Sequence, residues 1–147
     1  PMEPVVIKFS AGVLAIPFVV AAIGVVAAIA FAWRREWFYS AVALLVAAIA
    51  GLIFGPSMLN DRVVITEDRI QQTTGFVWSP TVKGFEFDQV DYVLITEKRT
   101  GPKRRLSEVW EVHSIHGPVR DIDPGDLWEG NSYKIARLLR ERGVDVR

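Results

Sequence analysis

The chain has 147 residues, half of them hydrophobic, and its 17 basic and 17 acidic residues give a formal net charge of zero. This balance argues against a general nucleic-acid binder, which needs an excess of cations to hold phosphates. Because the chain has no cysteine, disulfides, thiolate metal sites, iron–sulfur clusters and cysteine nucleophiles are excluded.

Residues 9–33 and 37–59 form two long uncharged stretches near the N-terminus. Each is longer than the roughly 20 apolar residues with which a helix crosses a bilayer, and a helix satisfies its own backbone hydrogen bonds in lipid. The first stretch is also too long for the core of a signal peptide, which has about 7–15 apolar residues. We therefore predict a two-helix transmembrane hairpin over residues 1–60. Separately, a proline as the first residue, Pro1, would fit loss of an initiator methionine.

Only Arg34, Arg35 and Glu36 separate the two stretches, so the helices must be antiparallel neighbours. Aromatic residues gather at this loop, where amphipathic rings favour the level of the lipid headgroups. We expect Trp33, Trp37 and Tyr39 to lie at the membrane interface. Both ends of the hairpin should then face the same side of the membrane.

Small residues recur at every fourth position in both predicted helices, a spacing that lets two helix backbones approach closely in lipid. The predicted packing residues are Gly24, Ala28, Ala32, Ala43, Ala47, Gly51 and Gly55. Alanine-rich helices also produce such rows by chance. No charged residue lies inside either span, which argues against a proton relay, an ion path or a transport site in the hairpin.

Residues 61–147 have a different composition and predict a soluble α+β domain with several strands and one C-terminal helix. β-Branched residues follow Asp61, and Ser79-Pro80 is expected to break the strand pattern before an alternating run at 83–87. Residues 90–96 are the most apolar run and predict a central strand. Asn131 or Ser132 can cap the terminal helix, and Gly143 can end it.

The segment VVITEDRIQQTTGF, the strand entry FEFDQVDYV and the closing IARLLRERGVDV resemble bacterial pleckstrin-homology-like (PH-like) domains. The resemblance covers residues 62–146, and in that family such a domain commonly follows a pair of membrane helices. It implies a bent, partly closed antiparallel β-sheet capped by the C-terminal helix. It also implies a non-enzymatic binding or scaffolding role in the bacterial inner membrane, with the soluble domain on the cytoplasmic side.

Five cations, Lys98, Arg99, Lys103, Arg104 and Arg105, surround Thr100-Gly101-Pro102 in an expected hairpin loop. Such a loop can contact anionic lipid headgroups, pair with acidic residues of another protein, or simply be solvated. Eukaryotic phosphoinositide-binding relatives carry cations in the first hairpin loop. Here that loop reads Thr66-Glu67-Asp68-Arg69, which speaks against specific phosphoinositide recognition.

No residue pattern indicates a metal, a cofactor or a catalytic group. His113 and His116 lack a matching set of ligands, and the aspartates at 121, 123 and 126 fit a turn better than a calcium loop, because Pro124 interrupts the spacing. There is no G-x-S-x-G motif, phosphate loop or dinucleotide fingerprint. Trp78, Trp110 and Trp128 are interpreted as core or interface anchors.

Two functions remain open from the sequence. The first is a non-enzymatic accessory or scaffold subunit that packs its hairpin and soluble domain against a larger membrane complex, photosynthetic or respiratory, and stabilises it. The second is a stand-alone membrane-anchored module that binds anionic lipid headgroups or a signalling partner. The expected partners are therefore the bilayer and other membrane-protein subunits, and not nucleic acid.

Overall fold

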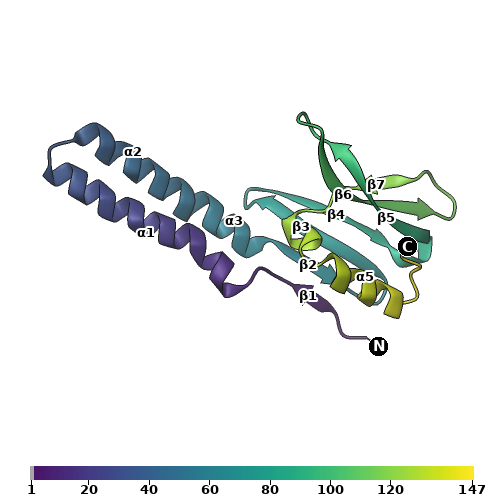
Figure 1. Cartoon of the computed structure of the whole chain (residues 1–147). Helices are drawn as coiled ribbons and strands as arrows, with labels where there is room; N and C mark the ends of the chain where they lie inside the picture. The colour runs from purple at the N-terminus through teal and green to yellow at the C-terminus, as the bar shows by residue number, and fades with distance from the viewer. Residues whose placement is uncertain (1) are drawn as a thin grey trace. The chain divides into compact units, whose positions relative to one another are not determined.

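The computed structural model describes residues 2–147 and divides into two compact units, which are described separately (Figure 1). The first unit contains Phe9–Asp61 together with the hairpin turn Thr74–Thr81. The second contains the chain up to Lys8, Arg62–Thr73 and Val82–Arg147. The chain thus combines two long apolar helices with antiparallel sheets and short helices, a mixed α+β class.

Two helices in the first unit are long and apolar enough to cross a membrane: Ala11–Trp33 and Trp37–Asn60. Their bounds agree within two residues with the predicted stretches. The first, α1, begins after Ser10, whose hydroxyl accepts a hydrogen bond from the backbone N–H of Val13 at 3.4 Å. Such a cap satisfies one of the free donors in the first turn.

The second helix changes its winding along its length. It runs as α2 (Trp37–Ala48), then as the π-helical segment η1 (Ile49–Phe54), and then as α3 (Gly55–Asn60). Pro56 lacks a backbone donor, so a regular α-helix would leave one carbonyl of the preceding turn without a partner. The wider π turn lies directly before this proline, where such local rearrangements are common.

The turn between α1 and α2 closes by backbone hydrogen bonds alone. The Glu36 N–H donates to the Phe31 carbonyl at 2.9 Å and the Arg35 N–H donates to the Ala32 carbonyl at 3.0 Å. This is the Schellman arrangement, in which the residue past the helix adopts a left-handed conformation. Arg35 has this conformation (φ 59°), although glycine is the usual residue there.

A four-stranded antiparallel sheet in the second unit has the order β1-β2-β3-β4. Strand β1 (Val5–Ile7) precedes the helices and pairs with β2 (Arg62–Ile65), so that Ile7 lies opposite Val63. The apolar pattern predicts residues 1–60 as the helical hairpin, and nothing in it indicates this strand. A three-residue strand gains its stability from its partner, and that partner lies more than fifty residues further along the chain.

The expected break at Ser79-Pro80 is wrong. After β3 (Arg69–Phe76) the chain turns at Val77-Trp78, and β4 (Ser79–Glu86) begins at Ser79. Pro80 is tolerated because β4 is the edge strand of the sheet, where a missing backbone donor need not cost a ladder bond. Phe87 does not continue the strand and instead starts the short 3₁₀ helix η2 (Phe87–Gln89).

The second sheet has the order β5-β6-β7, formed by Val90–Thr100, Arg105–Ser114 and Arg120–Ile122. β6 is therefore its middle strand, whereas β5 was the predicted central one. The free edge of β5 is covered by the C-terminal segment. Val93 pairs with Val146 in a parallel bridge: the Val93 N–H donates to the Asp145 carbonyl, and the Arg147 N–H donates to the Val93 carbonyl, each at 2.8 Å.

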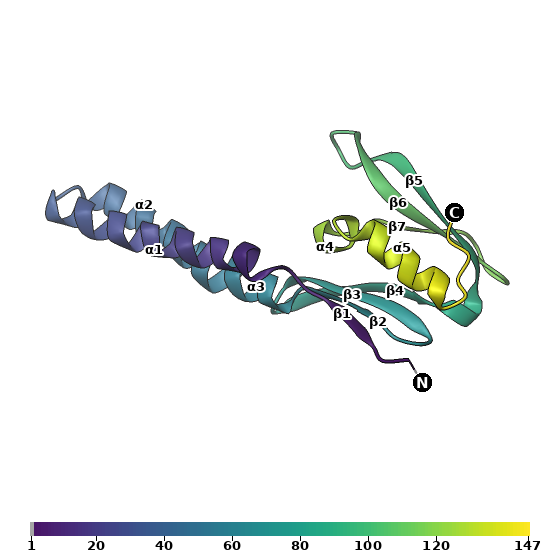
Figure 2. The ribbon, with the colours of Figure 1, turned by 60° about the horizontal axis from the view of Figure 1, so that its bottom comes forward.

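The two C-terminal helices are α4 (Asp126–Glu129) and α5 (Ser132–Glu141), and α5 ends before Gly143, as predicted. Figure 2 shows α5 between the two sheets. Hydrogen bonds hold both of its ends: the Nε of Arg142, just past α5, donates to the Thr66 carbonyl in the β2–β3 turn at 3.0 Å, and the Ser132 hydroxyl donates to Glu108 on β6. Gly143 has a φ of 85°, the left-handed conformation that glycine adopts most readily.

Two tryptophans form the centre of this unit. Trp110 on β6 and Trp128 on α4 are both fully buried, and their rings meet edge to face with centroids 5.2 Å apart. The Trp110 indole N–H donates to Glu108 Oε1 at 2.7 Å, the same oxygen that accepts from Ser132. Glu108 therefore connects the core tryptophan to the start of α5.

Replacing Trp128 with alanine removes the edge-to-face contact and leaves a large cavity, so we expect the free energy of unfolding to fall by about 3–5 kcal/mol. Urea unfolding in detergent micelles, followed by circular dichroism, measures the loss. Tyr133→Ala is the matched control, because that side chain is 81% exposed, and it should change stability by less than about 0.5 kcal/mol. Equal stability of the two variants would contradict this account of the core.

Candidate interaction surfaces

The helical pair packs through small residues. A Cβ placed on Gly24 of α1 would lie 2.9 Å from the Cβ of Ala47 and 3.1 Å from the carbonyl oxygen of Ala43. A Cβ on Gly51 would lie 3.2 Å from that of Ala21. These approaches are closer than ordinary side-chain contact, so the backbones meet where glycine permits it.

The other predicted packing residues lie along the same line of contact between α1 and the second helix, which we call the seam. They are buried to different extents. Ala28 and Ala47 are buried, and Ala32 and Ala43 are half-buried. Gly55 is also buried, and a Cβ there would lie 2.7 Å from the Phe18 ring. This last neighbour is an aromatic side chain and not a second small residue.

The sequence pattern does not predict a polar contact that the structure shows between the helices. The Ser40 hydroxyl on α2 donates to the backbone carbonyl of Ala28 on α1 at 2.8 Å. The helices therefore share one hydrogen bond as well as the small-residue seam. A serine in an apolar run is the only feature of the sequence that could have indicated it, and serine bonds equally well within its own helix, as Ser57 does to the Ile53 carbonyl.

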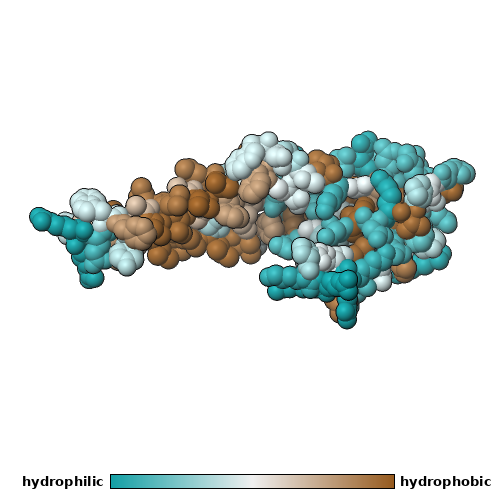
Figure 3. Space-filling model, turned by 90° about the horizontal axis from the view of Figure 1, so that it is seen from above, coloured by the Kyte–Doolittle hydropathy of each residue, from teal (hydrophilic) through white to brown (hydrophobic). Residues whose placement is uncertain are grey.

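Most of the helical surface remains uncovered. Only 17% of the most apolar window of the first helix and 22% of that of the second is buried. Figure 3 shows apolar residues gathered along the helices and hydrophilic residues at the end with the turn 34–36. The predicted interface residues Trp33, Trp37 and Tyr39 are 89%, 69% and 57% exposed around that turn.

The basic cluster lies on the hairpin of β5 and β6, which supports the expected hairpin position. Lys98 and Arg99 are on β5, Lys103 and Arg104 are in the turn, and Arg105 begins β6. The turn places Gly101 and Arg104 in the left-handed region, with φ of 75° and 45°.

Lys98 differs from the other cations of the cluster because it forms ion pairs within the domain. Its Nζ lies 2.5 Å from Glu111 Oε1 on β6 and 2.9 Å from Asp121 Oδ2 on β7. Hydrogen bonding to Glu111 raises the pKa of Lys98, and the same bond lowers the pKa of Glu111. Lys98 therefore joins three strands and is poorly placed to meet an external anion.

The other four cations, Arg99, Lys103, Arg104 and Arg105, are exposed. Among residues 2–147, none of the four takes part in an ion pair. We call these four residues the cationic tip. The cluster of five predicted cations thus separates into one structural residue and four that face solvent.

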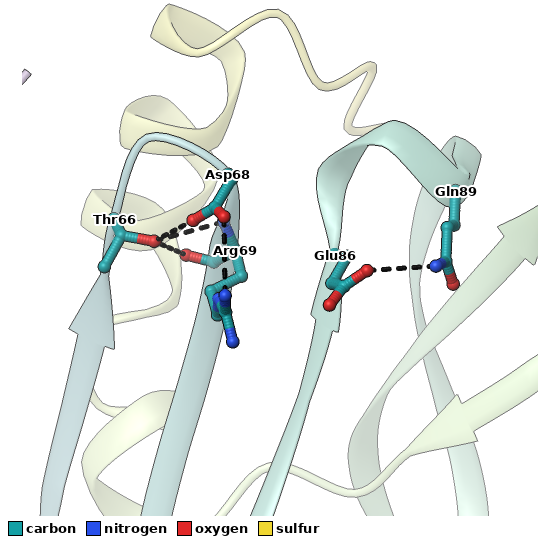
Figure 4. A network of polar contacts seen from close by, with 5 residues as sticks. All are labelled: Thr66, Asp68, Arg69, Glu86 and Gln89. Atoms are coloured by element: carbon teal, nitrogen blue, oxygen red, sulfur yellow. Dashed lines mark hydrogen bonds and ion pairs between the residues drawn. The ribbon is translucent and has the colours of Figure 1, made fainter. Parts of the chain in front are cut away.

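The turn between β2 and β3 carries the opposite charge. A cavity of about 300 Å³ is lined by Glu67, Asp68, Glu86 and Asp88. Figure 4 shows that Asp68 accepts a hydrogen bond from Thr66 at 2.7 Å and lies beside Arg69. These neighbours lower the pKa of Asp68, the Thr66 hydroxyl contributing most. Such an acidic surface opposes phosphate binding, in line with the sequence-based expectation for this loop.

The two histidines lie in different surroundings. His113 stacks on Tyr92 with ring centroids 4.1 Å apart, and the Arg147 guanidinium lies 4.1 Å from the same Tyr92 ring. His116 lines a separate cavity of about 380 Å³ with Asp88 and Arg120. Within residues 2–147 no three histidine or acidic side chains are grouped as a metal site.

Comparison with known proteins found no matching family model, no matching curated protein and no matching solved structure. The class that the fold and surfaces define is a mixed α+β chain with two helices that are long and apolar enough to span a membrane.

Substituting Gly24 with leucine forces a side chain into the Ala43 and Ala47 backbone, so we expect the helical pair to lose about 1–3 kcal/mol of stability. Gly12→Leu is the matched control, because a Cβ at Gly12 meets nothing within 4 Å. Thermal unfolding in detergent micelles, followed by the helical circular dichroism signal, compares the two. Identical midpoints would show that the seam does not hold the helices together.

The ion pair of Lys98 predicts a pH dependence. The lowered pKa of Glu111 stabilises the fold fully above the unfolded value near 4.5, and this contribution is lost as the pH falls through the folded pKa. The raised pKa of Lys98 stabilises the fold below its unfolded value near 10.5, and this is lost as the pH rises through the folded pKa. We expect Lys98→Met to be less stable than the unaltered protein at pH 7, by an amount that shrinks below pH 4.5.

Denaturant unfolding at pH 7 and at acid pH measures this difference. The matched control is Lys103→Met, which removes a cation of the cationic tip and should leave stability unchanged at both values. A constant deficit for Lys98→Met across the acid range would mean that lost packing, and not the ion pair, causes its effect.

Proposed function

We propose that the chain is a non-enzymatic accessory subunit of a membrane complex, anchored in the bacterial inner membrane by its helical hairpin. The soluble domain, a PH-like module on the cytoplasmic side, contacts an acidic surface of a larger membrane protein through the cationic tip. In this role the hairpin supplies lateral attachment, and the domain supplies orientation and specificity.

The observation that carries the proposal is the uncovered apolar surface of the two helices. The seam of small residues covers only a narrow stripe of each, and the spans contain no charged residue that would serve transport. Such a pair needs lipid or other membrane helices around it, since exposed apolar surface of this extent marks an interaction site.

The arrangement of the second unit supports the PH-like assignment. α5 lies between two antiparallel sheets, and its ends are hydrogen-bonded to β6 and to the β2–β3 turn, which fits a bent sheet closed by a C-terminal helix. The helical pair is inserted after the first strand of the sheet, so the domain includes residues on both sides of the hairpin.

The cationic tip also favours the second candidate, a stand-alone module that binds anionic lipid headgroups. Each cation near such a surface contributes about 1 kcal/mol, so four would give measurable attachment. Protein contact is preferred here because the domain carries both the cationic tip and the acidic β2–β3 turn, a mixed charge pattern that suits a complementary protein surface.

The test compares two triple variants in the native membrane. Lys103→Gln/Arg104→Gln/Arg105→Gln should reduce co-purification of partner subunits at least tenfold, because three charge-assisted contacts are lost. The matched control, Arg120→Gln/Lys134→Gln/Arg137→Gln, removes the same charge from exposed residues elsewhere in the domain and should retain the partners.

Recovery of the unaltered protein only as a free monomer or homo-oligomer would overturn the subunit proposal. Binding of the purified protein to anionic vesicles, lost in the first variant and kept in the second, would favour the lipid-binding candidate.

A further inference from the structure

The turn between β3 and β4 carries three adjacent exposed apolar side chains. Phe76, Val77 and Trp78 are 45%, 49% and 66% exposed. The rings of Phe76 and Trp78 stack with centroids 4.9 Å apart and planes within 1° of parallel. An aromatic pair fixed in this way presents one apolar surface. We call residues 76–78 the aromatic tip.

The register of the sheet shows where the aromatic tip lies relative to α3. Arg62 follows the last residue of α3, Asn60, after one intervening residue, and Thr73 pairs with Arg62. Because β3 runs antiparallel to β2, Thr74, Gly75 and Phe76 continue past Arg62 in the direction of α3. At about 3.3 Å per residue this extension is about 10 Å, close to the length of the six-residue α3 at 1.5 Å per residue.

A second observation agrees with the register. Thr74–Thr81 groups with the helices and not with the remainder of its own sheet. Figures 1 and 2 both show the β3–β4 turn beside α3. The aromatic tip is thus level with the last turns of the second apolar helix, at the end opposite the turn 34–36.

The composition of the segment suits the boundary of a bilayer. No charged residue lies between Arg69 and Lys83. Tryptophan is enriched at the headgroup level because its ring is apolar and its N–H is polar, while phenylalanine and valine gain free energy by leaving water. The turn 34–36 has its own aromatic residues at the other end of the helices.

We propose that the aromatic tip inserts into the headgroup region of the membrane and acts as a third anchor beside the two helices. The anchor fixes the β3–β4 hairpin against the bilayer surface and so limits the orientations of the soluble domain. This inference rests on the proposed membrane insertion of the helices. The partner that the aromatic tip contacts is lipid.

Single-cysteine labelling tests it, because the chain has no cysteine and one introduced thiol reports one site. Val77→Cys, Leu44→Cys and Tyr133→Cys each replace an exposed residue, at 49%, 56% and 81%. Each variant is labelled with the fluorophore NBD in phosphatidylcholine–phosphatidylglycerol liposomes. Quenching is then measured with iodide in the water and with lipids that carry a nitroxide at a shallow or a deep chain position.

We expect the label at Val77 to be protected from iodide several-fold relative to Tyr133 and to be quenched best by the shallow nitroxide. The label at Leu44 should be quenched best by the deep one. Phe76→Ser/Trp78→Ser in the Val77→Cys background should raise iodide quenching to the level of Tyr133.

The remaining outcomes overturn the inference in distinguishable ways. A label at Val77 as open to iodide as Tyr133, with Leu44 still protected, removes the third anchor and leaves the membrane hairpin intact. A label at Leu44 that is open to iodide removes the hairpin's insertion and the anchor with it. Protection at Val77 without nitroxide quenching means that a second copy of the chain, and not lipid, covers the aromatic tip.

Discussion

The antiparallel pairing of Ile7 with Val63 is the interaction on which the rest of the chain depends. It joins the strand before the helices to the strand after them, so the helical pair is an insertion between two neighbouring strands of one sheet. The chain must leave this sheet and return to it at adjacent positions. A pair of antiparallel helices with a three-residue turn satisfies that requirement, whereas a single long helix would leave β1 and β2 at its opposite ends.

Within the pair, the two helices approach each other closely, which is the kind of contact that holds helices together where no hydrophobic drive acts between them. Gly24 and Gly51 let the backbones meet, and the Ser40 hydroxyl adds a hydrogen bond to the Ala28 carbonyl. The π segment before Pro56 keeps the second helix continuous. It accommodates the missing donor within the helix, so the second helix reaches Asn60, next to the start of β2, without an interruption.

Features that depend on local composition could be predicted from the sequence. The two apolar helices, the β5–β6 hairpin and the glycine that ends α5 all follow from residues that are close together in the chain. The failures involve distant partners. The strand Val5–Ile7 exists because of β2, Pro80 is tolerated because β4 lies at a sheet edge, and the structural role of Lys98 depends on Glu111 and Asp121. None of these partners is visible in a window of neighbouring residues.

The same dependence on partners explains why net charge describes this chain poorly. A net charge of zero suggests a surface on which positive and negative charges are evenly mixed. The fold instead separates them into an acidic turn at Glu67 and Asp68 and the cationic tip at the β5–β6 hairpin. Lys98 is neutralised by two carboxylates, so only four of the five clustered cations remain for an external partner. Two surfaces of opposite sign on one small domain are the reason why we propose a partner with a matching charge pattern, because complementary charges determine which surfaces associate.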